Sequence, residues 1–338
     1  MVSLKDISAV CGVSVATVSK ALNDHKDIGE ETKENIKRVA KEMGYLPNSA
    51  AKALKTNRTY NIGVLFTDEA HNGLRHDYFA AVLDSLKKTV EARGYDMTFI
   101  NCSQKRPNKM SYLNHVRYRG FDGVVIACVD FYDDEVAELI NSDVPVVTID
   151  HTFNNRIAVV SDNVNGMKEL LNYIYEMGHR CIAYIYGSDT AVTRNRLTSF
   201  YRTAEELGLD VPDFYVKESA YRDIDRAEKL TRELLKLNAP PTCIIYPDDL
   251  SAFGGINAIE KKGLRIPEDI SIAGYDGIWI GRHIEPKMTT LIQDTDQIGI
   301  QAGKKIISLI EKPKSTVIEQ VVIRGKVYEG ETVREIKK

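Results

Sequence analysis

The chain has 338 residues, of which 43 % are hydrophobic and 28 % are charged, as is usual for a soluble protein of two or more domains. The first residues lack the apolar run of a secretory signal, and no stretch approaches the roughly 18 apolar residues of a membrane span, which predicts a cytoplasmic protein. The net charge of −3 is unevenly distributed: residues 1–58 hold ten Lys and Arg against seven Asp and Glu, so a basic head suited to nucleic acid precedes an acidic body.

Three short helices are predicted in the first 44 residues. A capping-box sequence, Ser-x-x-Asp, starts a helix over residues 4–11, and Gly12 ends it in a tight turn. Ser14 can cap a second helix over residues 15–23, and a third helix over about residues 30–43 carries one apolar face. Two short helices joined by a glycine turn and closed by a third form the helix-turn-helix pattern.

The second of these helices is the predicted recognition helix for DNA. Its outward face carries Ala16 and Lys20, and Val15 lies at its leading edge, although the spacing of Val15 to Val18 also suits the core. Short polar side chains on this helix and at its cap suit contacts with phosphate: Ser14, Thr17, Ser19 and Asn23. A three-helix bundle that binds no DNA is the alternative at this point.

A weak basic helix is predicted next. Pro47 favours an extended residue before it and a helix start after it, and Asn48 can cap the short segment SAAKALK. About two turns of helix do not hold together alone in water, so this segment needs a partner. A second copy of the segment and a DNA groove both fit, because its small residues permit close approach and Leu54 has the shape of a minor-groove wedge. Docking on the body of the chain is the alternative.

From residue 60 onward, apolar strands alternate with amphipathic helices. The predicted strands include the segments NIGVLF, DMTFINC, GVVIA, VPVVTID, CIAYIYG, PTCIIYPDD and DISIAGYD, and residues 78–93 form the first helix between them. Such alternation predicts an α/β fold with parallel sheets that are covered by helices on both faces. About ten strands are too many for one sheet, so two doubly wound lobes are expected.

Polar side chains gather where these strands end. They are Asp150, Asp248, Asp249, Asp276, Gln293 and Asp294, with Arg194 and Arg196 at the start of a helix. Because ligands bind outside the carboxyl ends of parallel strands, we expect these side chains to line a cleft. Carboxylates, an amide, a guanidinium and aromatic planes together suit a polyhydroxylated ligand. For each aspartate, capping of a helix N-terminus is an equally good interpretation.

The segments LKDISAVCGVSVATVSKALN and GYLPNSAAKAL resemble the headpiece and hinge of the LacI/GalR family of bacterial transcription regulators. The resemblance implies a helix-turn-helix headpiece over residues 1–46, followed by a hinge helix and linker over residues 47–59. The positions that match the family's base-reading and hinge residues are Val15, Ala16, Lys20, Ala51 and Leu54, with Leu54 as the wedge at the operator centre. Lys20 stands where the family often has Arg, which implies a different operator preference because Arg and Lys bind guanine differently.

The body resembles the family's effector domain, which is similar to periplasmic sugar-binding proteins, through segments such as DNVNGMKEL, GHRCIAYIYG and GLRIPEDISIAGYDG. The resemblance implies an effector domain over residues 60–338, with a first lobe of about 60–161 and 291–322 and a second lobe of about 162–290 and 323–338. The matching ligand positions are Tyr78, Phe79, Asp162, Arg196, Tyr221, Asp248, Asp276 and Gln293. The final REIKK has no heptads, so a homodimer is expected.

The implied function is a DNA-binding repressor of a sugar-utilisation operon that a sugar-like effector releases from a palindromic operator. Some relatives need their ligand as a corepressor, and a purine or nucleoside effector stays open. A solute-binding protein would share the body of this chain but would lack the headpiece.

An enzyme is the least favoured class of protein. The chain contains no G-x-G-x-x-G, P-loop or G-x-S-x-G motif, and we expect no cofactor. Five cysteines form no C-x-x-C pair, which predicts reduced core residues and no metal site: Cys11, Cys102, Cys128, Cys181 and Cys243.

Overall fold

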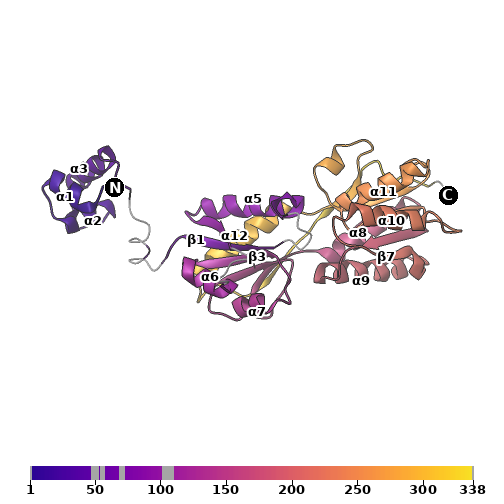
Figure 1. Cartoon of the computed structure of the whole chain (residues 1–338), viewed down its shortest axis with the longest axis horizontal. Helices are drawn as coiled ribbons and strands as arrows, with labels where there is room; N and C mark the ends of the chain where they lie inside the picture. The colour runs from indigo at the N-terminus through magenta and orange to yellow at the C-terminus, as the bar shows by residue number, and fades with distance from the viewer. Residues whose placement is uncertain (1, 47–52, 54–57, 68–72, 101–109, 337–338) are drawn as a thin grey trace. The chain divides into compact units, whose positions relative to one another are not determined.

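The computed structural model describes residues 2–46, 53, 58–67, 73–100 and 110–336 (Figure 1). The chain divides into two compact units, which meet in the sequence between Thr59 and Tyr60, where the effector domain is expected to start. The predicted hinge residues Ala51 and Leu54 lie outside the described residues.

The first unit contains the three predicted helices, α1 (Leu4–Cys11), α2 (Val15–Leu22) and α3 (Glu30–Glu42). Ser3 and Asp6 form the predicted reciprocal cap at the start of α1, and Gly12, with a φ of 67°, ends it. A small apolar core joins the three helices, and its buried members are Ile7, Val18, Ala21, Ile36, Val39 and Ala40. The helix-turn-helix fold is therefore confirmed.

The described residues of the second unit form two six-stranded sheets. The first has the order β11-β5-β4-β3-β1-β2, with β1 (Asn61–Phe66), β2 (Asp96–Phe99), β3 (Gly123–Cys128), β4 (Val146–Ile149), β5 (Ile157–Ser161) and β11 (Gln320–Ile323). The second has the order β12-β10-β9-β8-β6-β7, with β6 (Ile182–Tyr186), β7 (Val216–Glu218), β8 (Cys243–Ile245), β9 (Ser271–Asp276), β10 (Thr289–Ile292) and β12 (Lys326–Tyr328). Only β12 pairs antiparallel among these strands, which confirms two doubly wound lobes.

Helices cover both faces of each sheet (Figure 1). On the first sheet, α5 (Asp77–Glu91) and α12 (Thr295–Glu311) lie opposite α6 (Tyr112–Arg119) and α7 (Asp134–Ile140). On the second sheet, α8 (Asn163–Glu176) and α9 (Ala191–Glu206) lie opposite α10 (Ile224–Leu234) and α11 (Asp249–Lys261). Short 3-10 turns are η1 (Gly73–Arg75), η2 (Asp213–Tyr215) and η3 (Ile280–Arg282).

Helix α12 packs on α5 through a very close contact. A Cβ atom on Gly299 would lie 2.5 Å from the carbonyl oxygen of Val82 and 2.6 Å from the backbone nitrogen of Leu86. One turn later, a Cβ atom on Gly303 would lie 2.7 Å from the side chain of Thr89. The two glycines therefore let the backbones of α5 and α12 touch, which places the start of α5 beside the crossover into α12.

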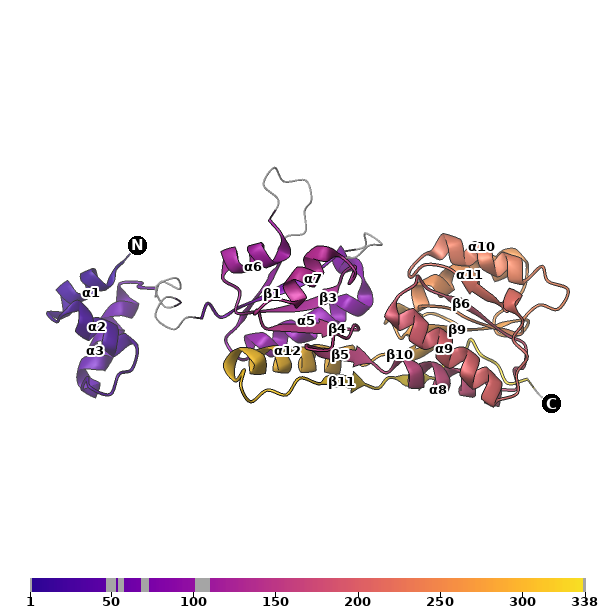
Figure 2. The same ribbon diagram turned by 90° about the horizontal axis from the view of Figure 1, so that it is seen from below.

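The chain crosses between the lobes at three places that lie side by side (Figure 2). The first crossing follows Ser161 and the third follows Ile323, and the backbone nitrogen of Asp162 donates to the Ile323 carbonyl at 2.8 Å. The second crossing was predicted near residue 290, with the first lobe resuming at about residue 291. Leu291 and Ile292 still pair with β9 in the second sheet, so the second crossing begins at Gln293.

The cysteines differ from their prediction. Cys243 is buried, Cys11 and Cys128 are partly buried, and Cys181 is exposed, so Cys181 is not a core residue. Cys102 lies outside the described residues. None of the helices in the described ranges has the length and apolarity to cross a membrane.

Candidate functional site

A cavity of about 450 Å³ lies between the two lobes, at the carboxyl ends of their strands. Its polar and aromatic lining comes from the first lobe, the second lobe and the second crossover, and comprises His76, Tyr78, Phe79, Phe131, Asp150, His151, Ser188, Thr190, Arg196, Tyr221, Asp276 and Gln293. Pockets for small molecules usually measure roughly 300–1,000 Å³, so the cavity suits one such ligand. Six of the eight predicted ligand residues therefore lie around one cavity.

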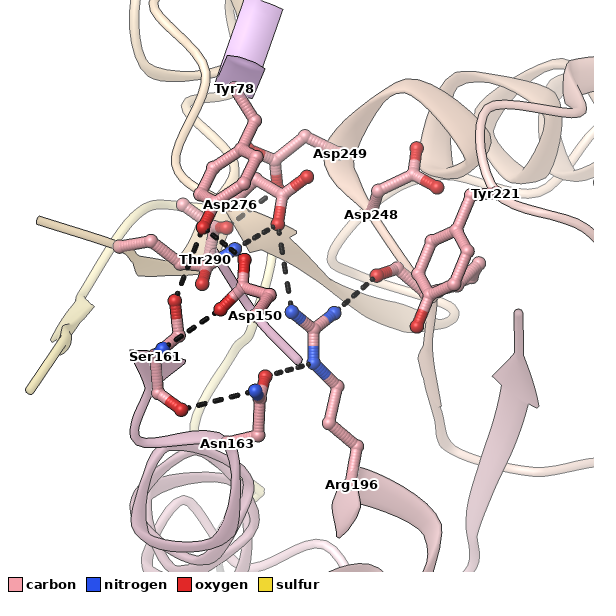
Figure 3. A network of polar contacts seen from close by, with 12 residues as sticks. Tyr78, Asp150, Ser161, Asn163, Arg196, Tyr221, Asp248, Asp249, Asp276 and Thr290 are labelled. Atoms are coloured by element: carbon pink, nitrogen blue, oxygen red, sulfur yellow. Dashed lines mark hydrogen bonds and ion pairs between the residues drawn. The ribbon is translucent and has the colours of Figure 1, made fainter. Parts of the chain in front are cut away.

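Arg196, on α9, is fixed from several sides (Figure 3). Its Nε donates to Asn163 Oδ1 at 2.8 Å and its Nη1 donates to the Pro247 carbonyl at 3.1 Å, while Nη2 lies 3.9 Å from Asp276 Oδ1. Its guanidinium carbon lies 3.6 Å from the centroid of the Tyr275 ring. The side chain is 4 % exposed, so these contacts replace water around a buried charge.

Asp276 and Gln293 form a second polar group beside Arg196. Gln293 Nε2 donates to Asp276 Oδ1 at 2.6 Å, while Gln293 Oε1 is buried and has no hydrogen-bond partner among the described residues. Burial raises the pKa of Asp276 to about 6, against the opposing effect of Arg196. Tyr78, Asp276 and Gln293 also line a second cavity, of about 710 Å³, and so form a wall that both cavities share.

In the first lobe, Tyr78 and Asp150 hold each other in place. The Tyr78 hydroxyl donates to Asp150 Oδ2 at 2.5 Å, and Asp150 Oδ1 accepts from the backbone nitrogen of Ser161 at 2.9 Å (Figure 3). Asp150 follows β4 and has a φ of 56°, a left-handed conformation that Asp adopts more readily than most residues. Burial, together with the Asp150 carboxylate, raises the pKa of Tyr78, so its hydroxyl remains a donor.

Aromatic rings form the rest of the first-lobe wall. Phe131 and His151 stack with ring centroids 4.1 Å apart and planes at 9°, and Phe153 lies behind His151. Burial lowers the pKa of His151, which favours the neutral ring at physiological pH. On the opposite side of the cavity, the Tyr221 hydroxyl lies 2.8 Å from Thr193 Oγ1. Flat apolar faces thus oppose the polar group around Arg196.

Two predicted ligand residues do not line this cavity. Asp162 caps α8 by accepting from the backbone nitrogen of Asn165 at 3.1 Å. Asp248 is 2 % exposed and caps α11, and it accepts from the backbone nitrogens of Ser251 and Arg222, both at 2.8 Å. Asp248 therefore takes the helix-cap position that was the alternative for the strand-end aspartates, and Asp162 caps a helix as well.

Several residues in or beside the cavity were absent from the ligand positions that match the family. Asp150 is one of them, although its place at the end of a predicted strand put it among the side chains expected to line a cleft. Phe131 and His151 lie in the loops after β3 and β4, and they meet only because these strands are neighbours. Asn163 acts through its bond to Arg196, which no local pattern indicates.

The recognition helix α2 presents its predicted residues to solvent. Val15 is 38 % exposed, so it does not belong to the core, and Ala16 and Lys20 are also exposed. Ser14 caps the helix by accepting from the backbone nitrogen of Thr17 at 3.1 Å. Lys20 Nζ pairs with Asp27 at 2.5 Å. Ser19 lies on the same helix, and Asn23 lies at its C-terminal end. Asn23 Nδ2 donates to the Ser19 carbonyl at 2.6 Å.

Within the described ranges, no group of three His, Cys, Asp or Glu side chains is placed to hold a metal ion. The helix-turn-helix unit and the two-lobed, ligand-sized cavity define a DNA-binding regulator with a small-molecule effector. Two family models match the chain: "Bacterial regulatory proteins, lacI family" over residues 3–48, and "Periplasmic binding proteins and sugar binding domain of LacI family" over residues 59–331. The chain therefore belongs to the LacI family of bacterial transcriptional regulators.

Relatives and solved structures agree with this family. The transcriptional repressor PurR of Histophilus somni strain 129Pt is 30 % identical over 339 residues, which cover 97 % of this chain and 99 % of the relative. The lac repressor dimer bound to operator and the anti-inducer ONPF has the same fold, with a TM-score of 0.83 at 21 % identity over 98 % of this chain and 99 % of that one. The regulator CelR in complex with cellobiose has a TM-score of 0.71 at 23 % identity over 98 % and 100 %. The chain is a transcriptional repressor that binds DNA.

Proposed function

We propose that the protein represses a sugar-utilisation operon by binding a palindromic operator as a homodimer, and that a sugar-like effector in the cavity releases it. Two copies of the headpiece would place two α2 helices on two half-sites, which is why a palindrome is expected. The cytoplasm is the place where such a regulator meets both DNA and effector.

A sugar is proposed as the effector because Arg196, Asp276 and Gln293 form a polar group beside the Tyr221 ring. Carboxylate and amide oxygens accept from adjacent hydroxyls of a sugar, a guanidinium donates to its oxygens, and an aromatic ring covers its apolar face. The CelR complex, which has the same fold, contains the sugar cellobiose. The proposed effector residues are Tyr78, Phe79, Arg196, Tyr221, Asp276 and Gln293, with Asp162 and Asp248 in supporting positions.

In the operator complex, Val15, Ala16 and Lys20 are proposed to contact bases, and Leu54 to enter the minor groove from the hinge that also carries Ala51. Short polar side chains are proposed to contact phosphate: Ser14, Thr17, Ser19 and Asn23. Lys20 would have to leave Asp27 to reach a base, so this ion pair opposes operator binding modestly.

Replacing Leu54 with alanine is expected to weaken operator binding by about 30-fold, because the unstacked base step loses the apolar group that holds it open. Effector affinity should stay unchanged, since the described lining of the cavity belongs to the effector domain, whereas Leu54 belongs to the predicted hinge segment. Fluorescence anisotropy with a labelled palindrome at fixed salt measures the first quantity and calorimetry the second. Val10→Ala, at an exposed position of α1, is the matched control. Unchanged operator affinity of Leu54→Ala would remove the wedge from the proposal.

The function as a whole is tested by operator binding with and without a panel of sugars at fixed salt, because phosphate contacts make the affinity depend strongly on salt. Loss of binding with one sugar supports the proposal and identifies the effector. Operator binding that no member of the panel alters contradicts a sugar effector.

A purine or nucleoside corepressor is the second candidate. The flat wall of Phe131 and His151 favours it, since a planar base stacks well on such rings. Operator binding that tightens when hypoxanthine, guanine or a nucleoside is added would establish this alternative over the sugar.

Effector affinity is expected to fall as the pH drops below about 6, the pKa of Asp276 in the free chain. Hydroxyls of the effector donate more strongly to the ionised carboxylate than to the protonated one, so the bound state lowers this pKa and binding loses up to about tenfold per pH unit on the acid side. Above that pH the affinity should level off. Calorimetry at a series of pH values measures the profile, and Asp276→Asn should flatten it. A constant affinity of the unchanged protein through this range would show that Asp276 does not accept from the effector.

A further inference from the structure

Arg222 belongs to the second lobe, and its side chain reaches across to the first lobe. It follows Tyr221 in the turn before α10, in the second lobe, and its backbone has a φ of 60°. An Arg in this left-handed conformation is uncommon and costs backbone energy. Its side chain is only 9 % exposed, although no described residue of its own lobe pairs with its guanidinium.

The guanidinium of Arg222 binds the first lobe instead. Its Nη1 donates to Asp77 Oδ2 at 3.0 Å, and its Nη2 donates to the Arg75 carbonyl at 3.1 Å. Its Nε is buried without a hydrogen-bond partner among the described residues. Asp77 begins α5 and Arg75 ends η1 just before it, both in the first lobe, so these bonds exist only while the two lobes are close together.

Both residues of this contact, Arg222 and Asp77, are next to residues that line the cavity. Tyr221, next to Arg222, lines the cavity, and so do Tyr78 and Phe79, which follow Asp77. The backbone nitrogen of Arg222 donates to the buried Asp248, which caps α11. The ring of Tyr221 is held against Gly187, where a Cβ atom would lie 2.5 Å from the ring. The position of Arg222 is therefore rigidly tied to that of the Tyr221 ring.

We propose that Arg222 is a positioning residue that couples effector binding to closure of the lobes: its bonds to Asp77 and Arg75 stabilise the closed cavity in which Tyr221 meets Tyr78 and Phe79. This proposal rests on the proposed function, because it concerns the response of the same cavity. Arg222 does not line the cavity, so it acts on affinity through the closed population and, to a lesser extent, through its charge, which lowers the pKa of Asp276.

The contact is suited to opening and closing. Asp77 is 54 % exposed in the closed arrangement, so both charged groups can return to water when the lobes separate. Arg196 and Asp276 differ in this respect, since both belong to the second lobe and stay together in either arrangement. The bond between Arg222 and Asp77 is thus a cross-lobe contact that lobe movement can break without leaving either charged side chain buried and unpaired.

Arg222→Asn tests the proposal with little change in the backbone, because Asn tolerates a positive φ. We expect its effector affinity to fall by about tenfold, while operator affinity without effector stays within twofold. Arg226→Ala is the matched control, since the Arg226 side chain donates to the Glu218 carbonyl of its own lobe and to no other described residue. The paired change Arg222→Asp with Asp77→Arg should recover most of the affinity. An Arg222→Asn protein that binds as tightly as the unchanged chain would overturn the proposal.

A second measurement does not depend on the identity of the effector. Spin labels on p-acetylphenylalanine in place of the exposed Tyr118, in the first lobe, and Tyr201, in the second, report the distance between the lobes. Dilution with unlabelled chain restricts the signal to distances within one chain. Arg222→Asn should shift the distribution to longer distances, and the paired charge exchange should restore it. If no effector is found, only the proposed function fails, because the distance between the lobes can still be measured. An unchanged distance distribution in Arg222→Asn would overturn the coupling role itself.

Discussion

Replacing Arg196 with alanine is expected to abolish the response to the effector while operator binding persists. The guanidinium is the buried donor that holds Asn163 and the Pro247 carbonyl, and it faces Asp276 across the cavity wall. Its removal leaves the Asp276 carboxylate without its compensating charge, so its pKa rises further and it loses its role as an acceptor. We expect at least about a hundredfold loss of effector affinity, which equals about 3 kcal/mol. Calorimetry and operator release measure this loss.

Operator binding should persist because the headpiece has its own core in a separate unit. Arg202→Ala is the matched control, since Arg202 lies on the same helix, is 75 % exposed and pairs only with Glu206 among the described residues. Thermal unfolding distinguishes loss of the site from loss of the fold. An Arg196→Ala protein that is folded and still released from its operator at the usual effector concentration would remove Arg196 from the site.

Replacing Gly299 with alanine is expected to destabilise the first lobe by about 3 kcal/mol. The new Cβ atom would lie 2.5 Å from the Val82 carbonyl oxygen, and backbone atoms cannot rotate away as a side chain can. Helices α5 and α12 must therefore move apart and open the core that they share on the first sheet. Urea unfolding followed by circular dichroism measures the change, which should appear as an earlier transition of the first lobe.

Lys304→Ala, at an exposed position of the same helix, should leave the urea midpoint within its error. The displaced α5 also carries Tyr78 and Phe79, so Gly299→Ala should weaken effector binding as well. Full stability of Gly299→Ala would show that α12 approaches α5 less closely than the structure indicates.

Local patterns predicted the headpiece well because its helices are set by neighbouring residues. Ser3, Gly12 and Ser14 start or end helices through bonds that span only a few residues, and each occupies its predicted place. The alternation of the body likewise predicted two doubly wound lobes. The strands β11 and β12 were not predicted, since they are short edge strands with exposed residues and lack a continuous apolar run.

The site was predictable only in part. Asp276 and Gln293 stand at strand ends and reach the cavity, whereas Asp162 and Asp248 occur in similar positions and cap helices. The same side chain serves both purposes, so the sequence pattern does not distinguish them. The contact of Arg222 with Asp77 joins residues that are far apart in the chain, and it depends on how the lobes close.

The three crossings also determine the order in which a growing chain becomes complete on the ribosome. The described core of the headpiece contains no residue beyond the first 46, whereas the first sheet lacks its edge until β11 has been made and the second until β12 has been made. Both edge strands come from the last part of the chain. During synthesis, the part that recognises DNA therefore has its fold long before the part that senses the effector, and both lobes are finished almost together.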